Sequence, residues 1–291
     1  MTLRYLDRLA ARTAAVRSVL CVGIDPVPEA LPAGFSRDLA GVERFALLIV
    51  EAAGPYAAAI KPNLAFYEAH GSAGMAALER IRACIPTGIP VVMDAKRGDI
   101  ATTAAQHAVA LFDRLGADAV TVSPYPGSEG LAPLFAREDR FAYVLCRTSN
   151  PGAAEIQNLV VEADPDGGAP AEALYLRVAR HAASWGPGET VGLVVGATAP
   201  AELHAIRAVA PASAVLVPGI GAQGGDIAAV LRDGPATAGP TAAGAGRGLL
   251  VNVSRGISGA VPRAGDGHAG DVGTTLAEAA ADWAARLPVL P

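Results

Sequence analysis

Residues 89–122 read IPVVMDAKRGDIATTAAQHAVALFDRLGADAVTV, and their pattern indicates the architecture of the whole chain. An apolar run at 89–94 ends in charged residues, a helical stretch follows at 101–115, and a second apolar run spans 118–122. Both runs are continuous rather than alternating, which is typical of parallel strands covered on both faces. The segment therefore predicts a strand, a helix and a second parallel strand, the repeating unit of α/β proteins.

The same unit recurs along the chain. We expect eight strands, each followed by a helix, and one extra helix at about 3–17 before the first strand. The predicted strands are 19–24, 57–61, 89–94, 118–122, 141–146, 191–196, 213–217 and 249–253. The predicted helices are 41–53, 72–84, 101–115, 128–137, 171–185, 200–209, 224–232 and 275–286. Eight units in 291 residues fit a closed (β/α)8 TIM barrel better than the competing doubly wound sheet. We expect one α/β domain over residues 1–291.

Two segments beside the eighth strand have low-complexity sequences. Residues 234–248 read GPATAGPTAAGAGRG, and residues 258–273 read SGAVPRAGDGHAGDVG. Gly, Ala, Pro and Thr dominate the first segment, and we expect nothing in it to pack against the core. The sequence therefore predicts two flexible loop insertions.

Composition excludes several classes of protein. The chain is 52% hydrophobic with a net charge of −5, which argues against disorder and against a broad nucleic-acid-binding surface. No apolar run is long enough to span a membrane, and the first residues lack the apolar core of a secretory signal. Three cysteines without CxxC spacing argue against a disulfide framework or a zinc site. We expect a soluble cytoplasmic protein without nucleic-acid or membrane partners.

Lysine is rare in this chain. Its basic residues comprise 21 arginines and 2 lysines, Lys61 and Lys96. A lysine ammonium is compact and can donate a proton, whereas a guanidinium stays charged. Both lysines lie at the C-terminal ends of predicted strands, where a TIM barrel carries its active site. We infer that these two positions need the chemistry of lysine.

Asp94, Lys96 and Asp99 form a D-x-K-x-x-D motif at the end of the third predicted strand. Asp94 and Lys96 are two residues apart, so their side chains point to the same side, and Lys61 comes from the neighbouring strand. We expect alternating charges that offset the cost of burial and keep Lys96 protonated as a general acid. The alternatives are a structural ion-pair network and, for Asp99, a helix N-cap.

Polar residues follow other predicted strands too. Asp25 ends the first strand, and Ser149 follows the fifth. The glycine-rich stretch VPGIGAQGG after the seventh strand contains Pro218 and Gln223, and Arg255 follows the eighth strand. Barrels of this kind often bind phosphate there, through backbone N–H groups and a bidentate arginine. The alternative for the glycines is a turn that requires positive φ.

Seven motifs together resemble one family: GIDP (23–26), KPNLAFYEAHG (61–71), MDAKRGDI (93–100), VSPY (122–125), TSNPG (148–152), VPGIGAQGG (217–225) and VSRGI (253–257). Their order resembles the orotidine 5′-phosphate decarboxylase family, in the bacterial branch that carries DAKRGD. The resemblance runs from about residue 3 to 257, and the two low-complexity segments depart from it.

The resemblance implies a carboxy-lyase that converts orotidine 5′-monophosphate to UMP and CO2, the last step of de novo pyrimidine nucleotide synthesis. It implies a homodimer with shared active sites and no metal or other cofactor. Lys96 would protonate C6 of the pyrimidine, in an array with Lys61, Asp94 and the Asp99 of the partner subunit. The implied substrate-binding residues are Asp25, Ile100, Thr103, Ser149, Pro218, Gln223 and Arg255.

Two other functions stay open. A related sugar-phosphate decarboxylase or aldolase shares the D-x-K-x-x-D motif but would hold Mg²⁺ with a further acidic residue at a strand end. We find no obvious residue of this kind, because the second, fourth and fifth strands end in Lys61, Ser123 and Cys146. A non-catalytic nucleotide-binding barrel would need the phosphate loop but neither lysine.

Overall fold

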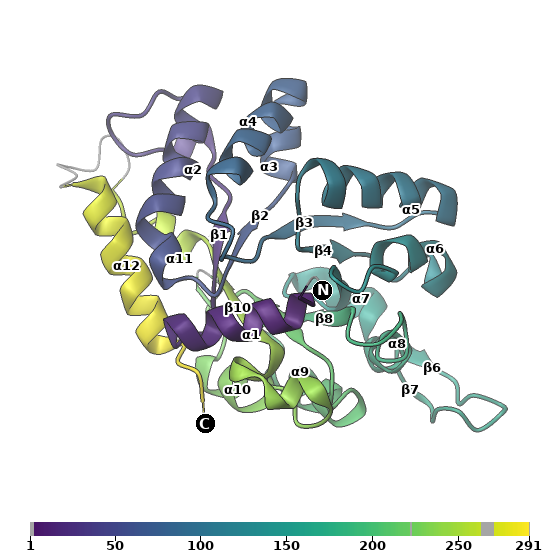
Figure 1. The fold of residues 1–291 in the computed structure, drawn as a ribbon. Helices are drawn as coiled ribbons and strands as arrows, with labels where there is room; N and C mark the ends of the chain where they lie inside the picture. The colour runs from purple at the N-terminus through teal and green to yellow at the C-terminus, as the bar shows by residue number, and fades with distance from the viewer. Residues whose placement is uncertain (1–2, 222, 263–270, 291) are drawn as a thin grey trace.

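Eight parallel strands form a barrel in the computed structural model, which describes residues 3–221, 223–262 and 271–290 (Figure 1). The strands are β1 (Leu20–Ile24), β2 (Ala59–Pro62), β3 (Val92–Arg97), β4 (Ala119–Val122), β5 (Phe141–Arg147), β8 (Val191–Val195), β9 (Val215–Pro218) and β10 (Leu249–Val253). They pair in the order β2-β1-β10-β9-β8-β5-β4-β3. Each predicted strand is present, with its ends shifted by at most three residues.

The barrel closes between β2 and β3. Parallel bridges join Ile60 to Val91 and Asn63 to Asp94. The backbone N–H of Ile60 donates to the carbonyl of Pro90 at 3.0 Å, and that of Leu64 donates to the carbonyl of Asp94 at 3.2 Å. The predicted TIM barrel is confirmed, and the doubly wound alternative is wrong.

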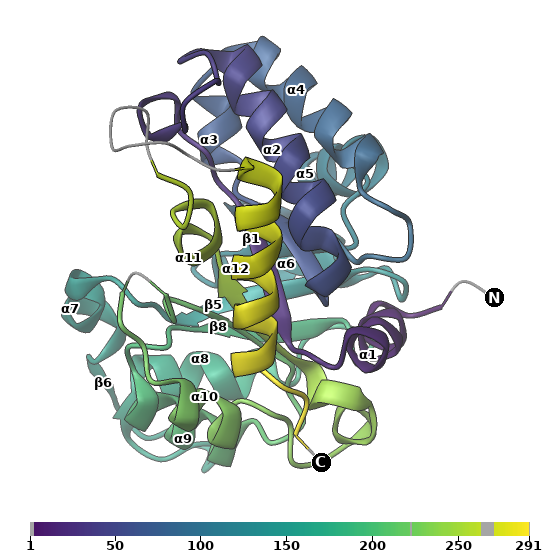
Figure 2. The same ribbon diagram turned by 90° about the vertical axis from the view of Figure 1, so that its left-hand side faces the viewer.

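Amphipathic helices cover the outside of the barrel because each buries one stripe against the strands. In α2 the buried positions Val42, Phe45, Ile49 and Ala53 recur every three or four residues. Figure 2 shows α12 lying along α2. The covering helices are α2 (Leu39–Ala53), α4 (Gly71–Cys84), α5 (Ala101–Ala108), α6 (Gly127–Phe135), α8 (Leu174–Ala182), α9 (Pro200–Val209), α10 (Ile227–Asp233) and α12 (Val272–Arg286).

Several short elements have no counterpart in the sequence prediction. They are the helices α3 (Ala65–Glu68), α7 (Ala154–Gln157) and α11 (Arg255–Ser258), and the antiparallel pair β6 (Val160–Val161) and β7 (Glu172–Ala173). Each has two to four residues, too few to show a periodic pattern. The predicted helix 171–185 is wrong at its start, where β7 lies, and α8 begins at Leu174. The predicted helix at 101–115 is also divided, because α5 continues as π-helix over Val109–Arg114.

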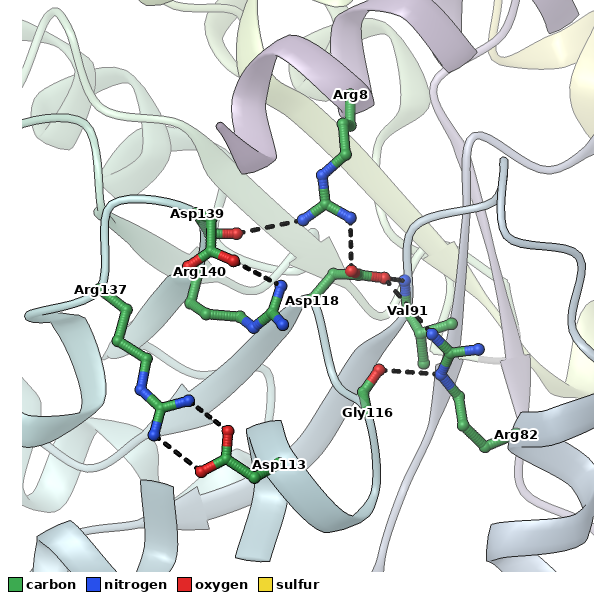
Figure 3. A network of polar contacts seen from close by, with 9 residues as sticks. All are labelled: Arg8, Arg82, Val91, Asp113, Gly116, Asp118, Arg137, Asp139 and Arg140. Carbon is green, nitrogen blue, oxygen red and sulfur yellow. Dashed lines mark hydrogen bonds and ion pairs between the residues drawn. The ribbon is translucent and has the colours of Figure 1, made fainter. Parts of the chain in front are cut away.

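The extra N-terminal helix, α1 (Tyr5–Val16), covers the N-terminal end of the barrel. The ring of Tyr5 stacks on Phe141 at 4.9 Å between centroids, and its hydroxyl lies 3.2 Å from that of Tyr143. Figure 3 shows Arg8 of α1 and Arg82 of α4 converging on Asp118, which directly precedes β4. Aromatic packing and a buried carboxylate therefore hold α1 against the barrel, on the end away from the predicted site.

The first low-complexity segment packs, contrary to expectation. Its residues form 3₁₀ turns at Pro240–Ala243 and Ala245–Gly248, and Ala236 and Thr241 are buried. A β-carbon on Gly246 would lie 2.7 Å from Cγ2 of Thr13, so small residues let this segment approach α1. The prediction that nothing in 234–248 packs is wrong. The segment is buried because its small residues let the backbone approach its neighbours closely, without large side chains.

The second low-complexity segment, 258–273, lies partly outside the described residues, which omit 263–270. Helix α12 begins at Val272, three residues before its predicted start, because the Asp271 carboxylate caps it by accepting from the N–H of Thr274 at 3.0 Å. Flexibility of the two segments stays a prediction. No helix in the described part of the chain has both the length and the hydropathy to cross a membrane.

Candidate active site

A cavity of about 700 Å³ opens at the C-terminal ends of the strands. This volume suits a small-molecule site, and the position is the one at which TIM barrels carry their active sites. Six of the predicted site residues line it: Asp25, Lys61, Asp94, Pro218, Gln223 and Arg255. The other five, Lys96, Asp99, Ile100, Thr103 and Ser149, are not part of its wall.

Asp94 stands between the two lysines. Nζ of Lys61 lies 2.9 Å from Oδ2 of Asp94, and Nζ of Lys96 lies 2.5 Å from Oδ1. Lys61 is buried, with 3% of its surface exposed, whereas the Lys96 side chain is 48% exposed. The structure thus brings three of the four predicted charged residues together as ammonium, carboxylate and ammonium.

Opposite charges keep Lys61 and Asp94 ionised. Burial by itself disfavours the Lys61 ammonium, but the carboxylates of Asp94 and Asp25 outweigh it and raise the pKa of Lys61 above its ordinary value. Burial likewise disfavours the Asp94 carboxylate, but the ammonium groups of Lys61 and Lys96 hold its pKa well below its ordinary value. Both groups therefore stay charged through the neutral pH range.

Asn63 is a cavity residue that the sequence analysis did not single out. It follows Lys61 by two residues, and its backbone N–H donates to Oδ1 of Asp25 at 3.0 Å. The hydroxyl of Tyr67 donates to the carbonyl of Ile24 at 3.1 Å, which fixes the backbone before Asp25. The spacing of Asn63 from Lys61 was the available signal, because alternate residues at a strand end share a side.

The loop after β9 approaches the loop after β5. Gly219 has φ of 95°, and a β-carbon there would lie 2.6 Å from Oε1 of Gln223 and 3.3 Å from Cβ of Ser149. The positive φ therefore favours glycine at this position, and the side chains of Gln223 and Ser149 lie close to it. Arg255, at the start of α11, lines the same cavity together with Ser254. Ser149 thus lies beside the loop of Gln223 without lining the cavity.

Asp99 lies outside the cavity. Its Oδ1 accepts a hydrogen bond from the N–H of Ile100 at 2.7 Å. Helix α5 has Ile100 as its N-cap and no capping side chain, so the N-cap alternative for Asp99 is wrong. A β-carbon on Gly130 of α6 would lie 2.7 Å from the carbonyl oxygen of Asp99, so this backbone packs on the outer helices. Asp99 and Ile100 are both exposed, and Thr103 on α5 is half-buried.

Comparison with known proteins identifies the family. The family model described as orotidine 5′-phosphate decarboxylase / HUMPS matches residues 18–269. The orotidine 5′-phosphate decarboxylase of Herpetosiphon aurantiacus is 45% identical over 87% of this chain and 88% of its own length.

Solved structures agree with the sequence match. The OMP decarboxylase of Leishmania donovani is 38% identical with a TM-score of 0.78, over 97% of this chain and 96% of that one. The UMP synthase of the same organism is 40% identical with a TM-score of 0.79, and this chain spans 57% of that longer protein. The chain belongs to the orotidine 5′-phosphate decarboxylase / HUMPS family.

Proposed function

We propose that this chain converts orotidine 5′-monophosphate to UMP and CO2. The observation that carries the proposal is the array of Lys61, Asp94 and Lys96, of which Lys61 and Asp94 line the barrel cavity. The family match and the relatives named decarboxylases support it. So does composition, because the only two lysines of the chain both lie in this array.

The array provides what the reaction requires. Loss of CO2 from C6 leaves the electron pair of the broken bond on that carbon, with no electron sink in the ring. The Lys96 ammonium stabilises this carbanion and then gives it a proton, forming the C6–H bond of the product. Because the Lys96 side chain is 48% exposed, its amine can regain a proton from solvent.

Asp94 has two roles in this proposal. Its carboxylate holds both ammonium groups, and it disfavours the charged substrate carboxylate placed beside it, which raises the energy of the bound ground state. Lys61, which is buried, keeps Asp94 ionised and does not need to exchange protons with solvent.

Four residues outside the array would bind the rest of the nucleotide: Asp25, Gln223 and Arg255 line the cavity, and Ser149 lies beside the Gly219 loop. Asp25 would accept hydrogen bonds from the ribose hydroxyls, and Ser149 would contact the pyrimidine edge. Gln223 and Arg255 would hold the 5′-phosphate, where a guanidinium can form a bidentate pair with the phosphate oxygens. Binding energy from this remote phosphate would position the ring against the array.

We further propose a homodimer in which Asp99, Ile100 and Thr103 of one subunit complete the site of the other. Ile100, which follows Asp99 in the chain, is 66% exposed, and Tyr125 is 98% exposed. A β-carbon on Gly98 would lie 3.2 Å from Cγ of Pro126, which places this segment against the Tyr125–Pro126 loop. An exposed apolar surface of this kind fits an isologous contact with a second copy.

A spectrophotometric assay with orotidine 5′-monophosphate tests the function. The purified chain is expected to consume this substrate and release UMP, with unchanged activity in EDTA, and Lys96→Ala is expected to abolish turnover. No turnover by the wild-type chain would overturn the proposal. Activity that EDTA removes and Mg²⁺ restores would instead favour the metal-dependent barrel enzymes.

A further inference from the structure

The catalytic pair of β3 lies in an irregular stretch of the barrel. Met93 pairs with Val120 and Arg97 pairs with Val122, so between these two pairs β3 advances by four residues while β4 advances by two. Asp94, Ala95 and Lys96 therefore form a bulge opposite one residue of β4, Thr121. Lys96 also has φ of 48°, a left-handed conformation that non-glycine residues seldom adopt. Bulges redirect side chains, and a strained residue persists only where its surroundings hold it.

The hydroxyl of Thr121 bridges this bulge. It donates to Oδ1 of Asp94 at 2.9 Å and accepts from the backbone N–H of Lys96 at 3.0 Å. Thr121 is 1% exposed. The buried hydroxyl of Thr121 thus donates its single proton to the Asp94 carboxylate and accepts the backbone N–H of Lys96 with a lone pair. It fixes Asp94 and Lys96 relative to each other, independently of the contact between their own side chains.

The strand sequence presents Thr121 to the inside of the barrel. Its neighbours Val120 and Val122 pack in the cluster between the strands and the outer helices, so Thr121 faces the opposite way. Valine has nearly the same shape as threonine and is common in these strands, so packing alone does not require a hydroxyl here. The hydroxyl provides the hydrogen-bond partner of two polar groups in the bulge, the Asp94 carboxylate and the Lys96 backbone N–H.

We propose that Thr121 is a positioning residue for the decarboxylation, which holds the Asp94 carboxylate and the Lys96 backbone in the arrangement that the chemical step uses. This inference rests on the proposed function. Thr121 acts through Asp94 and Lys96, and it contributes to the chemical step rather than to binding of the phosphate or the ribose.

The test compares Thr121→Val and Thr121→Ser with the wild-type enzyme. Hydrogen bonds to charged groups are worth enough to expect a fall in kcat of about 10-fold to 100-fold in Thr121→Val, with KM changed by less than about threefold. Thr121→Ser keeps the hydroxyl and is expected to stay within about threefold of wild-type kcat. Thr190→Val is the matched control, since Thr190, directly before β8, is also buried, and its Oγ1 has no hydrogen-bond partner among the described residues.

Three results would overturn the inference. They are wild-type kcat in Thr121→Val, an equal loss in Thr121→Ser, and a fall that Thr190→Val reproduces together with an equal fall in Tm. If Thr121→Val does not fold, Thr121→Ala replaces it, because Ala and Ser at this position differ only in the hydroxyl. A wild-type enzyme without decarboxylase activity would instead contradict the proposed function, which separates the two failures.

Discussion

Nζ of Lys96 lies 2.5 Å from Oδ1 of Asp94, whereas the buried Lys61 contacts the other oxygen, Oδ2. The two lysines therefore share one carboxylate but not one environment. Lys61 is enclosed in the barrel, whereas nearly half of the Lys96 side chain is exposed. A proton donor must be reloaded after each turnover, and only the lysine in contact with solvent meets that need directly. The difference in exposure supports the proposed roles, in which Lys96 transfers the proton and Lys61 supports the charge of Asp94.

Lys96→Arg is expected to fold, to bind UMP and to be almost inactive. The substitution keeps the positive charge beside Asp94, so part of the array survives. It removes the donor, because guanidinium stays protonated and its planar fork does not fit the place of a compact ammonium. General acid catalysis contributes about 10²-fold to 10⁴-fold, so kcat is expected to fall at least about 100-fold. The measurement is kcat beside a UMP titration.

Arg97→Lys is the matched control, since it exchanges the same two residue types at the next position. Arg97 pairs with Glu68 rather than with Asp94. Its kcat is expected to change much less than that of Lys96→Arg. If Lys96→Arg kept more than about a tenth of wild-type kcat, Lys96 could not be the proton donor, since that loss is below the general-acid range.

The sequence alone predicted the barrel because its strands are buried on both faces. Continuous apolar runs such as 191–195 fit only a strand that is covered on both faces in a structure of this class, and β8 occupies those residues. Lys61 and Asp94 could be placed together for the same reason, since the C-terminal ends of neighbouring parallel strands meet at one end of the barrel. The short helix α11 could not be predicted, because four residues carry no period.

The role of Thr121 could not be predicted from the sequence. A threonine within AVTV resembles any half-polar strand residue, and its importance depends on the bulge opposite it. That bulge contains the left-handed backbone of Lys96, which no local propensity predicts. The segment 234–248 was misjudged for a related reason, because Gly246 packs through the absence of a side chain.

Asp118→Ala is expected to lower the free energy of unfolding by about 2–3 kcal/mol. Oδ1 of Asp118 lies 2.5 Å from Nη1 of Arg8, and Oδ2 accepts from the N–H of Val91 at 2.8 Å, with the side chain only 9% exposed. The substitution leaves both donors without this acceptor and loosens α1 from the barrel. Urea denaturation measures the loss, and kcat is expected to stay near wild type because the site is at the other end.

Asp113→Ala is the control for that measurement. Asp113 pairs with Arg137 in the same region, as Figure 3 shows, but its side chain is 44% exposed. Exposed ion pairs contribute little to stability because water screens them. The change in unfolding free energy is expected to be clearly smaller than for Asp118→Ala. Equal effects would show that burial of Asp118 does not give it a special role.

Arg255→Ala is expected to lower kcat/KM at least tenfold, because a hydrogen bond to a charged group is worth roughly 1.5–3 kcal/mol. Arg255 lines the cavity beside the loop of Gln223. Added guanidinium ion is expected to restore part of the activity by occupying the vacated place. Arg4→Ala serves as control, since Arg4 pairs with Glu189 away from the cavity. An unchanged kcat/KM in Arg255→Ala would place the phosphate elsewhere.

Mixing Asp99→Ala subunits with Lys96→Ala subunits is expected to restore activity that neither variant has alone. Asp99 is exposed, does not line the cavity of its own subunit, and has its backbone packed against Gly130 on the outer helices. In a hybrid dimer one site combines Lys96 of the first subunit with Asp99 of the second and is complete. Random exchange makes half of the dimers hybrid with one intact site in each, so about a quarter of wild-type activity is expected.

The control for this experiment mixes Asp99→Ala subunits with subunits that carry both substitutions, since no hybrid of these has a complete site. Native mass spectrometry establishes in each mixture that the subunits have exchanged. If Asp99 acted in its own subunit, every site in the first mixture would lack either Asp99 or Lys96, and no activity would return. Exchange without recovery would therefore exclude the shared site, whereas recovery confined to the first mixture places Asp99 of one subunit beside Lys96 of the other.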